Sequence, residues 1–256
     1  MSRISIVSGW TNPGGSTVHF IELCNLLNDN GFDCTFYGPH SWHLDKCKSG
    51  TPSDVSLIDD DVLITHYVRV RNRVRKHILS CHETNMFPLK DMDLQCYDTI
   101  HYVSDFQRKW HSVDHPSVVI PPVVNKVKWK DPKNNTAGII GSIDCHKQTH
   151  LSIERAIKDG RSKVILFGTI NDAKYFNESV MPFLDDPDYV FVAGHIDDKE
   201  EMYSKVSVVY HSSKRETYGL VEAECKLAGI PFNGPSNHQD ILDKDEILEK
   251  WTNVLK

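Results

Sequence analysis

The sequence has no long hydrophobic segment and no dense set of cysteines. No apolar run approaches the roughly 18–20 residues that span a bilayer, and Met1–Arg3 leads into a short strand-like run without the apolar core of a secretory signal. The seven cysteines are odd in number, dispersed and without a Cys-x-x-Cys pair, unlike a secreted disulfide scaffold. We therefore expect free thiols and a cytoplasmic protein without a transmembrane segment.

A large excess of one charge is also absent. The chain carries 29 basic and 35 acidic residues, a formal net charge of −6, which excludes a uniformly basic nucleic-acid coat but not a local basic patch. Hydrophobic residues make up 39% and charged residues 25% of the sequence, as in ordinary globular proteins. The 256 residues suit one large or two small domains.

Short β-branched runs alternate with longer amphipathic stretches along the chain. This alternation predicts an α/β fold of parallel sheets with helices on both faces, whose ligands bind beyond the carboxyl ends of the strands. The predicted strands cover residues 4–8, 33–37, 62–66, 78–82, 99–103, 137–141, 164–168, 189–193 and 206–211. The predicted helices cover residues 16–30, 105–111 with Ser104 as N-cap, 150–158 and 199–205.

Two adjacent prolines, Pro121 and Pro122, interrupt the alternation near its middle. Because consecutive prolines hold the chain extended, we expect a hinge between two Rossmann-like domains, residues 1–120 and 121–239, that face a cleft. Apolar residues at near-helical spacing in 240–256 predict one or two closing helices, packed across the domains or on the first of them.

The most informative segment runs from Ser212 to Gly229, a predicted strand end, loop and helix. Gly219 lets the backbone turn closely at the start of the helix, where free amides and the positive end of the helix dipole favour a phosphate. Glu216 and Glu224 flank this position and can accept hydrogen bonds from sugar hydroxyls. The alternative is that both are ordinary carboxylates near a helix N-terminus.

The pair Glu216-x7-Glu224, followed by Ala228-Gly229, resembles the signature of retaining glycosyltransferases of the GT-B fold, family-four type. Weaker matches occur in order along almost the whole chain. They are Pro13-Gly14-Gly15, His82 after a strand, Val103-Ser104, Ile120-Pro121-Pro122, Gly141 with Lys147, and Phe191–Ile196.

The resemblance implies roles for individual positions. Glu224 would bind the ribose of a nucleotide, and Glu216 the hydroxyls of the donor sugar. Lys147 would neutralise the leaving phosphate and His82 would lie near the anomeric carbon, which makes Glu216 and His82 the catalytic candidates. The amides of Tyr218, Gly219, Leu220 and Val221 would bind the diphosphate, and Gly14 and Gly15 would close over it from the other domain.

The implied function is transfer of a sugar from a nucleoside-diphosphate sugar, the donor substrate, to an acceptor hydroxyl with retention of configuration. The resemblance implies no metal and no other cofactor, since lysine and helix dipoles take the place of a metal. Two of these positions also have a purely structural alternative: His82 could be a structural histidine, and Gly14-Gly15 a simple turn.

Three positions depart from the family pattern. Ser142 stands where the family has an arginine and Gln148 where it has a glycine, so one phosphate clamp is missing unless Lys214 or Arg215 replaces it. Ser212 stands in place of a proline. The four Asp-x-Asp strings lie in polar turns or before a strand, and the Cys-His pairs lack the spacing of a zinc site, so no metal is predicted.

A run of cations between two predicted strands does not follow from the family. Five cations in eight residues are either a solvated segment or a docking site for a polyanionic acceptor, such as a modified DNA base in a viral system or a lipid-linked or phosphorylated glycan. The run consists of Arg69, Arg71, Arg73, Arg75 and Lys76. Rival functions are a non-catalytic nucleotide-sugar-binding module, and a nucleotide-sugar epimerase or hydrolase.

Overall fold

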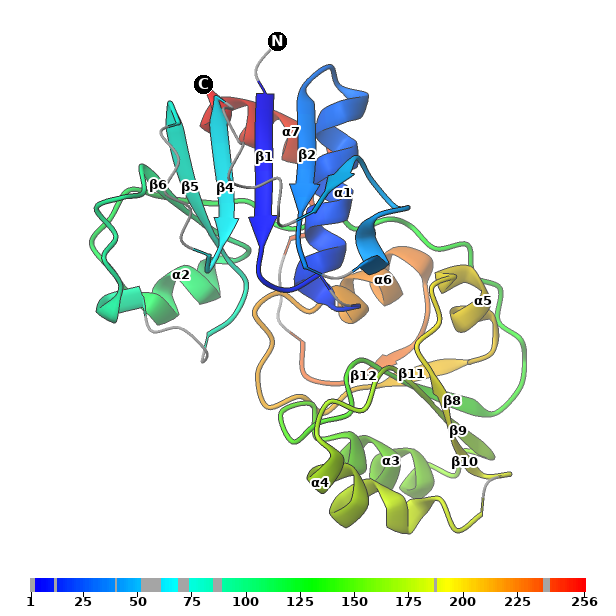
Figure 1. Cartoon of the computed structure of the whole chain (residues 1–256). Coiled ribbons are helices and arrows are strands. Elements are labelled where there is room, and N and C mark those ends of the chain that lie inside the picture. Colours follow the sequence, from blue (N-terminus) through cyan, green and yellow to red (C-terminus); the bar gives the residue numbers. More distant parts are fainter. Residues whose placement is uncertain are drawn as a thin grey trace. The chain divides into compact units, whose positions relative to one another are not determined.

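The computed structural model describes residues 3–11, 13–39, 41–51, 61–68, 74–84, 89–186, 188–236 and 240–256. The chain forms two compact units (Figure 1). The first unit consists of Met1–Val123 and Gln239–Lys256, and the second of Val124–His238. Each unit is built around its own sheet, and every strand pairing in both sheets is parallel.

The sheet of the first unit has the strand order β3-β2-β1-β4-β5-β6-β7. Its strands β1, β4 and β5 are almost continuously buried, as expected for a parallel sheet covered on both faces. The strands are β1 Arg3–Ser8, β2 Asp33–Tyr37, β3 Ser49–Gly50, β4 Val62–His66, β5 Lys76–Cys81, β6 Thr99–Tyr102 and β7 Ser117–Val119.

Three α-helices of the first unit are α1 Gly15–Asp29, α2 Asp105–His111 and α7 Lys244–Leu255, with 3-10 turns at Ser41–His43 and Leu89–Asp91. The predicted apolar face of α1 is confirmed, since Phe20, Leu23, Cys24 and Leu27 are fully buried. Ser104 caps α2 as predicted, accepting the N–H of Gln107 at 3.1 Å. None of the helices in the described ranges has the length and apolarity that a membrane span requires.

The C-terminal segment forms the single helix α7. A capping box of Asp243 and Glu246 begins it, with Asp243 Oδ1 accepting the N–H of Glu246 at 2.8 Å. Its apolar face, Ile247, Trp251 and Leu255, lies in the same hydrophobic core as α1, β1, β2 and β4. The closing segment thus completes the core of the first unit.

The sheet of the second unit has the order β10-β9-β8-β11-β12. Its strands are β8 Thr136–Ile140, β9 Lys163–Phe167, β10 Val190–Gly194, β11 Val208–Tyr210 and β12 Phe232–Asn233. Its helices are α3 Thr149–Lys158, α4 Ala173–Tyr175, α5 Lys199–Ser204 and α6 Leu220–Ala228. The chain continues from α4 through a π-helical turn, Phe176–Val180, and a 3-10 turn, Met181–Phe183.

The short strands β3 and β12 were not predicted, and two longer segments also differ from the sequence prediction. The connector around Pro121-Pro122 begins with a strand, because Ser117–Val119 pairs with β6 as β7 and Ile120 is fully buried. The helical segment 173–183 was not predicted; it consists of the short helix α4, a π-helical turn and a 3-10 turn, and Phe176 and Val180 pack into the core of the second unit.

Candidate functional site

The carboxyl ends of two neighbouring strands, β8 and β11, carry the polar loops of the second unit. The loops 141–148 and 211–219 follow these strands, and adjacent parallel strands end at the same edge of the sheet. The N–H of Lys214 donates to the carbonyl of His146 at 3.0 Å, and His146 Nε2 lies 2.7 Å from the carbonyl of Arg215. These bonds hold the two loops side by side.

Glu216 contacts side chains from both strand ends at this edge of the sheet. Its Oε1 lies 2.5 Å from Lys147 Nζ and 2.8 Å from His211 Nε2, and its side chain is 15% exposed. Burial by itself would raise the pKa of Glu216, but the hydrogen bond from His211 and the charge of Lys147 outweigh it and hold the pKa far below its usual range. Glu216 is therefore an ionised acceptor beside an ammonium group.

The loop that presents Lys147 is ordered by Asp144. Asp144 Oδ1 accepts the N–H groups of His146 and Lys147 at 2.9 and 2.8 Å, and Ser142 donates its hydroxyl to Oδ2 at 2.6 Å. Ser142, which departs from the family pattern, thus helps to shape the loop. Gly168, after β9, packs against it so closely that a Cβ would lie 1.9 Å from the carbonyl oxygen of Gly141.

Helix α6 begins at Leu220, four residues after Glu216. Gly219 is its N-cap with φ of 87°, a left-handed conformation that glycine adopts without a steric penalty, and the described part of the chain places no side-chain cap on this helix end. The first N–H groups of a helix have no intrahelical partner, and the first bond of α6 runs from Ala223 to Gly219. The amides that begin at Leu220 and Val221 thus form an electropositive helix end.

Glu224 lies in the middle of α6 and is buried. Its carboxylate accepts hydrogen bonds from Lys199 and from the hydroxyl of Tyr203, the latter at 2.7 Å. Both partners come from α5, so Glu224 links the two helices. A carboxylate has about four lone-pair sites, so these two bonds leave capacity for further hydroxyl donors.

The first unit holds the remaining candidates of the sequence analysis. Gly14 and Gly15 form the N-cap and the first residue of α1. His82 follows β5, is buried, and its Nε2 lies 3.1 Å from Ser80 Oγ. Burial, and secondarily the neighbouring rings of His19, His66 and His101, lower the pKa of His82 well below its usual value, so its ring is neutral near neutral pH.

Arg75, a cation of the basic run, contacts the end of α7. The guanidinium of Arg75 donates to the carbonyls of Lys256 and Leu255 at 2.6 and 2.9 Å, where α7 ends. Arginine commonly stabilises the last carbonyls of a helix in this way. Arg69, Arg71 and Arg73 lie outside the described residues.

The structure brings Lys147, Glu216 and the start of α6 together at one sheet edge, with Glu224 further along α6. Sequence reasoning missed His211 and Asp144, which position Glu216 and Lys147. Each had a signal: His211 ends a predicted strand, and Asp144 lies in the loop that follows another. The roles assigned to the site residues stay predictions.

The depressed pKa of Glu216 predicts a pH dependence of stability. Because the folded-state pKa lies below the ordinary 4.5, this carboxylate contributes stability that is present above that pH and is lost as the pH falls below it. We expect the difference in free energy of unfolding between wild type and Glu216→Gln to be larger at pH 7 than at a pH of about 3.5. Denaturant unfolding at both pH values measures it.

Glu154→Gln is the matched control, because Glu154 is an exposed glutamate of α3 in the same unit. Its difference from wild type should change little over the same range. A difference for Glu216→Gln that is independent of pH would contradict the ion-pair geometry.

Comparisons with known proteins show what the fold is. No family model and no curated protein matches the sequence. HepE from Anabaena, solved with UDP-glucose, matches with a TM-score of 0.71 at 13% identity, over 91% of this chain and 80% of that chain. TarM matches with a TM-score of 0.68 at 10% identity, over 100% and 91% of the two chains.

An α-glucosyltransferase in complex with UDP and a 13-mer DNA matches with a TM-score of 0.61 at 15% identity, over 99% of this chain and 89% of that chain. Identities this low establish the fold alone. The chain therefore has the α/β fold with two Rossmann-like parallel sheets that GT-B glycosyltransferases have, which confirms the expected fold class.

Proposed function

We propose that the protein is a glycosyltransferase that moves a sugar from a nucleoside-diphosphate sugar to an acceptor hydroxyl with retention of configuration. The observation that carries the proposal is the Lys147–Glu216 pair beside the start of α6. The GT-B fold and the Glu216-x7-Glu224 signature support it, and retention of configuration rests on that resemblance.

The donor's diphosphate is proposed to bind at the N-terminus of α6. Lys147 supplies a cation, and the amides of Tyr218, Gly219, Leu220 and Val221 supply hydrogen-bond donors where negative charge develops as the sugar departs. These groups are already fixed in place by Asp144 and by the loop hydrogen bonds. They supply the stabilisation that a metal would otherwise give, so we propose that the donor's phosphates need none.

The two glutamates are proposed to hold the sugars on either side of the diphosphate. Glu216, ionised by its partners, accepts hydrogen bonds from the donor sugar and orients its anomeric carbon. Glu224 accepts those of the ribose, sharing its oxygens with Lys199 and Tyr203. UDP is the first nucleotide to test, because HepE and the α-glucosyltransferase were solved with UDP-glucose and UDP.

His82, Gly14 and Gly15 keep their proposed roles at the sugar and the diphosphate. Because its ring is neutral, His82 would act there as a hydrogen-bonding group and not as a cation. We propose a polyanionic acceptor from the run Arg69–Lys76, with the DNA bound by the α-glucosyltransferase as a precedent in the same fold. Arg75 already binds the end of α7, so Arg69, Arg71 and Arg73 would carry this contact.

A thermal-shift screen tests the donor site. The full chain, without added metal, is heated with UDP, GDP, ADP and TDP and with their sugar conjugates. A ligand at about a hundred times its Kd adds roughly 2.7 kcal/mol of stability, so one nucleotide should raise the Tm clearly. Glu224→Gln should weaken that binding about 10- to 100-fold, since hydrogen bonds to a charged group contribute about 1.5–3 kcal/mol.

Glu154→Ala, an exposed glutamate of α3, is the control and should bind as wild type does. The absence of any shift on folded protein would contradict the donor site. Nucleotide binding without any product would indicate the non-catalytic module. The serine at position 142, where the resembling family has an arginine, would support that alternative. Donor consumption that no acceptor accelerates would indicate an epimerase or hydrolase.

A further inference from the structure

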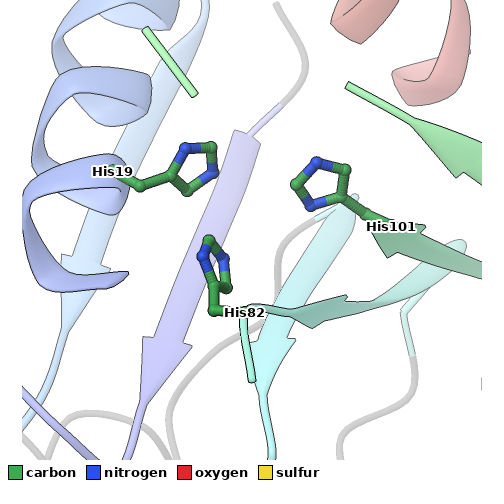
Figure 2. Close-up of side chains that lie close together, drawn as sticks. All are labelled: His19, His82 and His101. Carbon is green, nitrogen blue, oxygen red and sulfur yellow. The ribbon is translucent and has the colours of Figure 1, made fainter. Parts of the chain in front are cut away.

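Three buried histidines of the first unit point toward one another (Figure 2). His19 comes from α1, His82 follows β5, and His101 lies in β6. Their ring centroids are 4.7 Å apart for His19 and His82, 5.6 Å for His19 and His101, and 6.1 Å for His82 and His101. One ring nitrogen from each lies within 4.8 Å of those of the other two.

His19 is the member that packing does not explain. It is 1% exposed, and neither of its ring nitrogens has a hydrogen-bond partner among the described residues. Leaving one buried polar group without a partner costs about 1–3 kcal/mol, and buried polar groups are nearly always satisfied by protein, water or an ion. Phe20, the next residue in α1, is fully buried, so a purely apolar ring is accommodated beside His19.

His101 is already oriented as metal-binding histidines are. Its Nε2 lies 2.8 Å from the carbonyl of Ile120, which fixes the proton on that nitrogen. Nδ1 therefore accepts the hydroxyl proton of Ser80 at 2.8 Å, and this hydroxyl must turn away before Nδ1 can bind an ion; Ser80 Oγ also lies 3.1 Å from His82 Nε2. A backbone carbonyl behind a ligating imidazole is a usual outer partner of a metal site.

We propose that His19, His82 and His101 bind one transition-metal ion, with Zn²⁺ as the reference occupant. Imidazole is a preferred ligand of zinc, and three histidines with an open fourth position for water form a known zinc arrangement. At Zn–N distances of about 2.0–2.1 Å, tetrahedral ligand nitrogens lie about 3.3 Å apart. The ligand nitrogens, which lie within 4.8 Å of one another, would have to approach by up to about 1.5 Å to reach that distance.

The described surroundings offer partial compensation for the ion's charge. The ring of His66 lies 5.1 Å from that of His82, and its Nε2 is 3.0 Å from a carboxylate oxygen of Glu83. The ion would connect α1 to the ends of β5 and β6, elements that are distant in the sequence. This site takes one residue, His82, from the set proposed to meet the donor sugar, whereas Lys147, Glu216 and α6 of the second unit take no part in it.

Metal binding by the full chain tests the proposal. The protein is unfolded with a chelator, refolded with Zn²⁺ or Co²⁺, and freed of loose metal. We expect one ion per chain by elemental analysis, a visible spectrum typical of tetrahedral Co²⁺, and a higher Tm than that of the chelated protein. His101→Gln should retain no ion.

His19→Phe separates metal binding from folding. Because phenylalanine keeps the buried ring and removes the two unpartnered nitrogens, we expect the chelated variant to be at least as stable as the chelated wild type, but with no ion and no rise in Tm on adding Zn²⁺. His115→Gln is the control, since His115 bonds to the carbonyl of Tyr97 and stands outside the cluster; it should keep one ion.

Two results would overturn the proposal. One is wild-type protein that refolds without retaining any metal, which would leave the nitrogens of His19 to water. The other is equal metal content in wild type and His19→Phe, which would place the ion on other histidines of the chain.

Discussion

Replacing Lys147 by alanine is expected to lower the turnover of sugar transfer about 100- to 1000-fold, the usual cost of removing one preorganised group that stabilises developing charge. Lys147 Nζ lies 2.5 Å from Glu216 Oε1, in the loop next to the start of α6. In the proposed mechanism its charge stabilises the departing diphosphate. The variant removes that charge from the step in which the diphosphate leaves the sugar.

The measurement is the release of nucleoside diphosphate from the donor that the binding screen identifies, with water or a supplied hydroxyl compound as acceptor. Lys147→Arg keeps the charge and should keep part of the activity. Lys174→Ala is the control, because Lys174 is an exposed lysine in the same unit and makes only a surface ion pair with Glu178.

The division between kcat and KM distinguishes catalysis from binding. An effect confined to KM would mean that Lys147 binds donor and transition state equally. Full activity in a folded Lys147→Ala protein would refute the assignment of Lys147 and place the phosphate site elsewhere. Lys214 and Arg215, in the adjoining loop, would then be the next cations to test.

Trp251→Ala is expected to destabilise the first unit by about 3–5 kcal/mol, as for other buried tryptophans. Trp251 is fully buried on α7, in the core that α7 shares with α1 and the central strands, and its ring lies 4.7 Å from that of His101. The variant would leave a large cavity where the C-terminal helix closes the sheet.

Trp251→Phe separates the ring from its polar group. Trp251 Nε1 has no hydrogen-bond partner among the residues that the structure describes. Phenylalanine keeps an aromatic ring and removes this buried N–H, so we expect roughly half the cost of alanine or less. Trp110, 45% exposed on α2 with its Nε1 donating to the carbonyl of Thr84 at 2.9 Å, is the control, and its replacement by alanine should cost about 1–2 kcal/mol.

Urea unfolding followed by circular dichroism measures these differences, with the shift expected in the transition of the first unit, since a chain of two units need not unfold in one step. An alanine variant within about 1 kcal/mol of wild type would contradict the packing of α7. A phenylalanine variant as unstable as alanine would show that the indole N–H does have a partner.

The alternation of apolar runs determined much of the fold by itself. Strands 33–37 and 62–66 have the predicted bounds, and α1 and α2 begin and end within one residue of theirs. Strand 62–66 could be predicted because it is an apolar run buried on both faces, strand 33–37 alternates buried and half-buried residues, and α1 has a continuous apolar face. The helical segment 173–183 could not be predicted from the sequence, because its burial depends on contacts with distant strands.

The candidate site divides in the same way. Glu216, Glu224 and Lys147 were proposed from the sequence, because Glu216-x7-Glu224 and Gly141 with Lys147 resemble motifs of a known family. His211 and Asp144 were not, since a hydrogen bond to Glu216 or an ordered loop before Lys147 depends on which strands are neighbours. β8 and β11 are neighbours because they pair in parallel, and no local sequence pattern predicts this pairing.

The basic run and the three histidines show what only the tertiary structure decided. The sequence showed five cations together, but only the folded chain places Arg75 at the end of α7. His19, His82 and His101 lie in a predicted helix and in or at the ends of predicted strands, with no metal-ligand spacing among them. They meet because crossover connections return the chain to the same sheet, which brings together residues that are far apart in sequence.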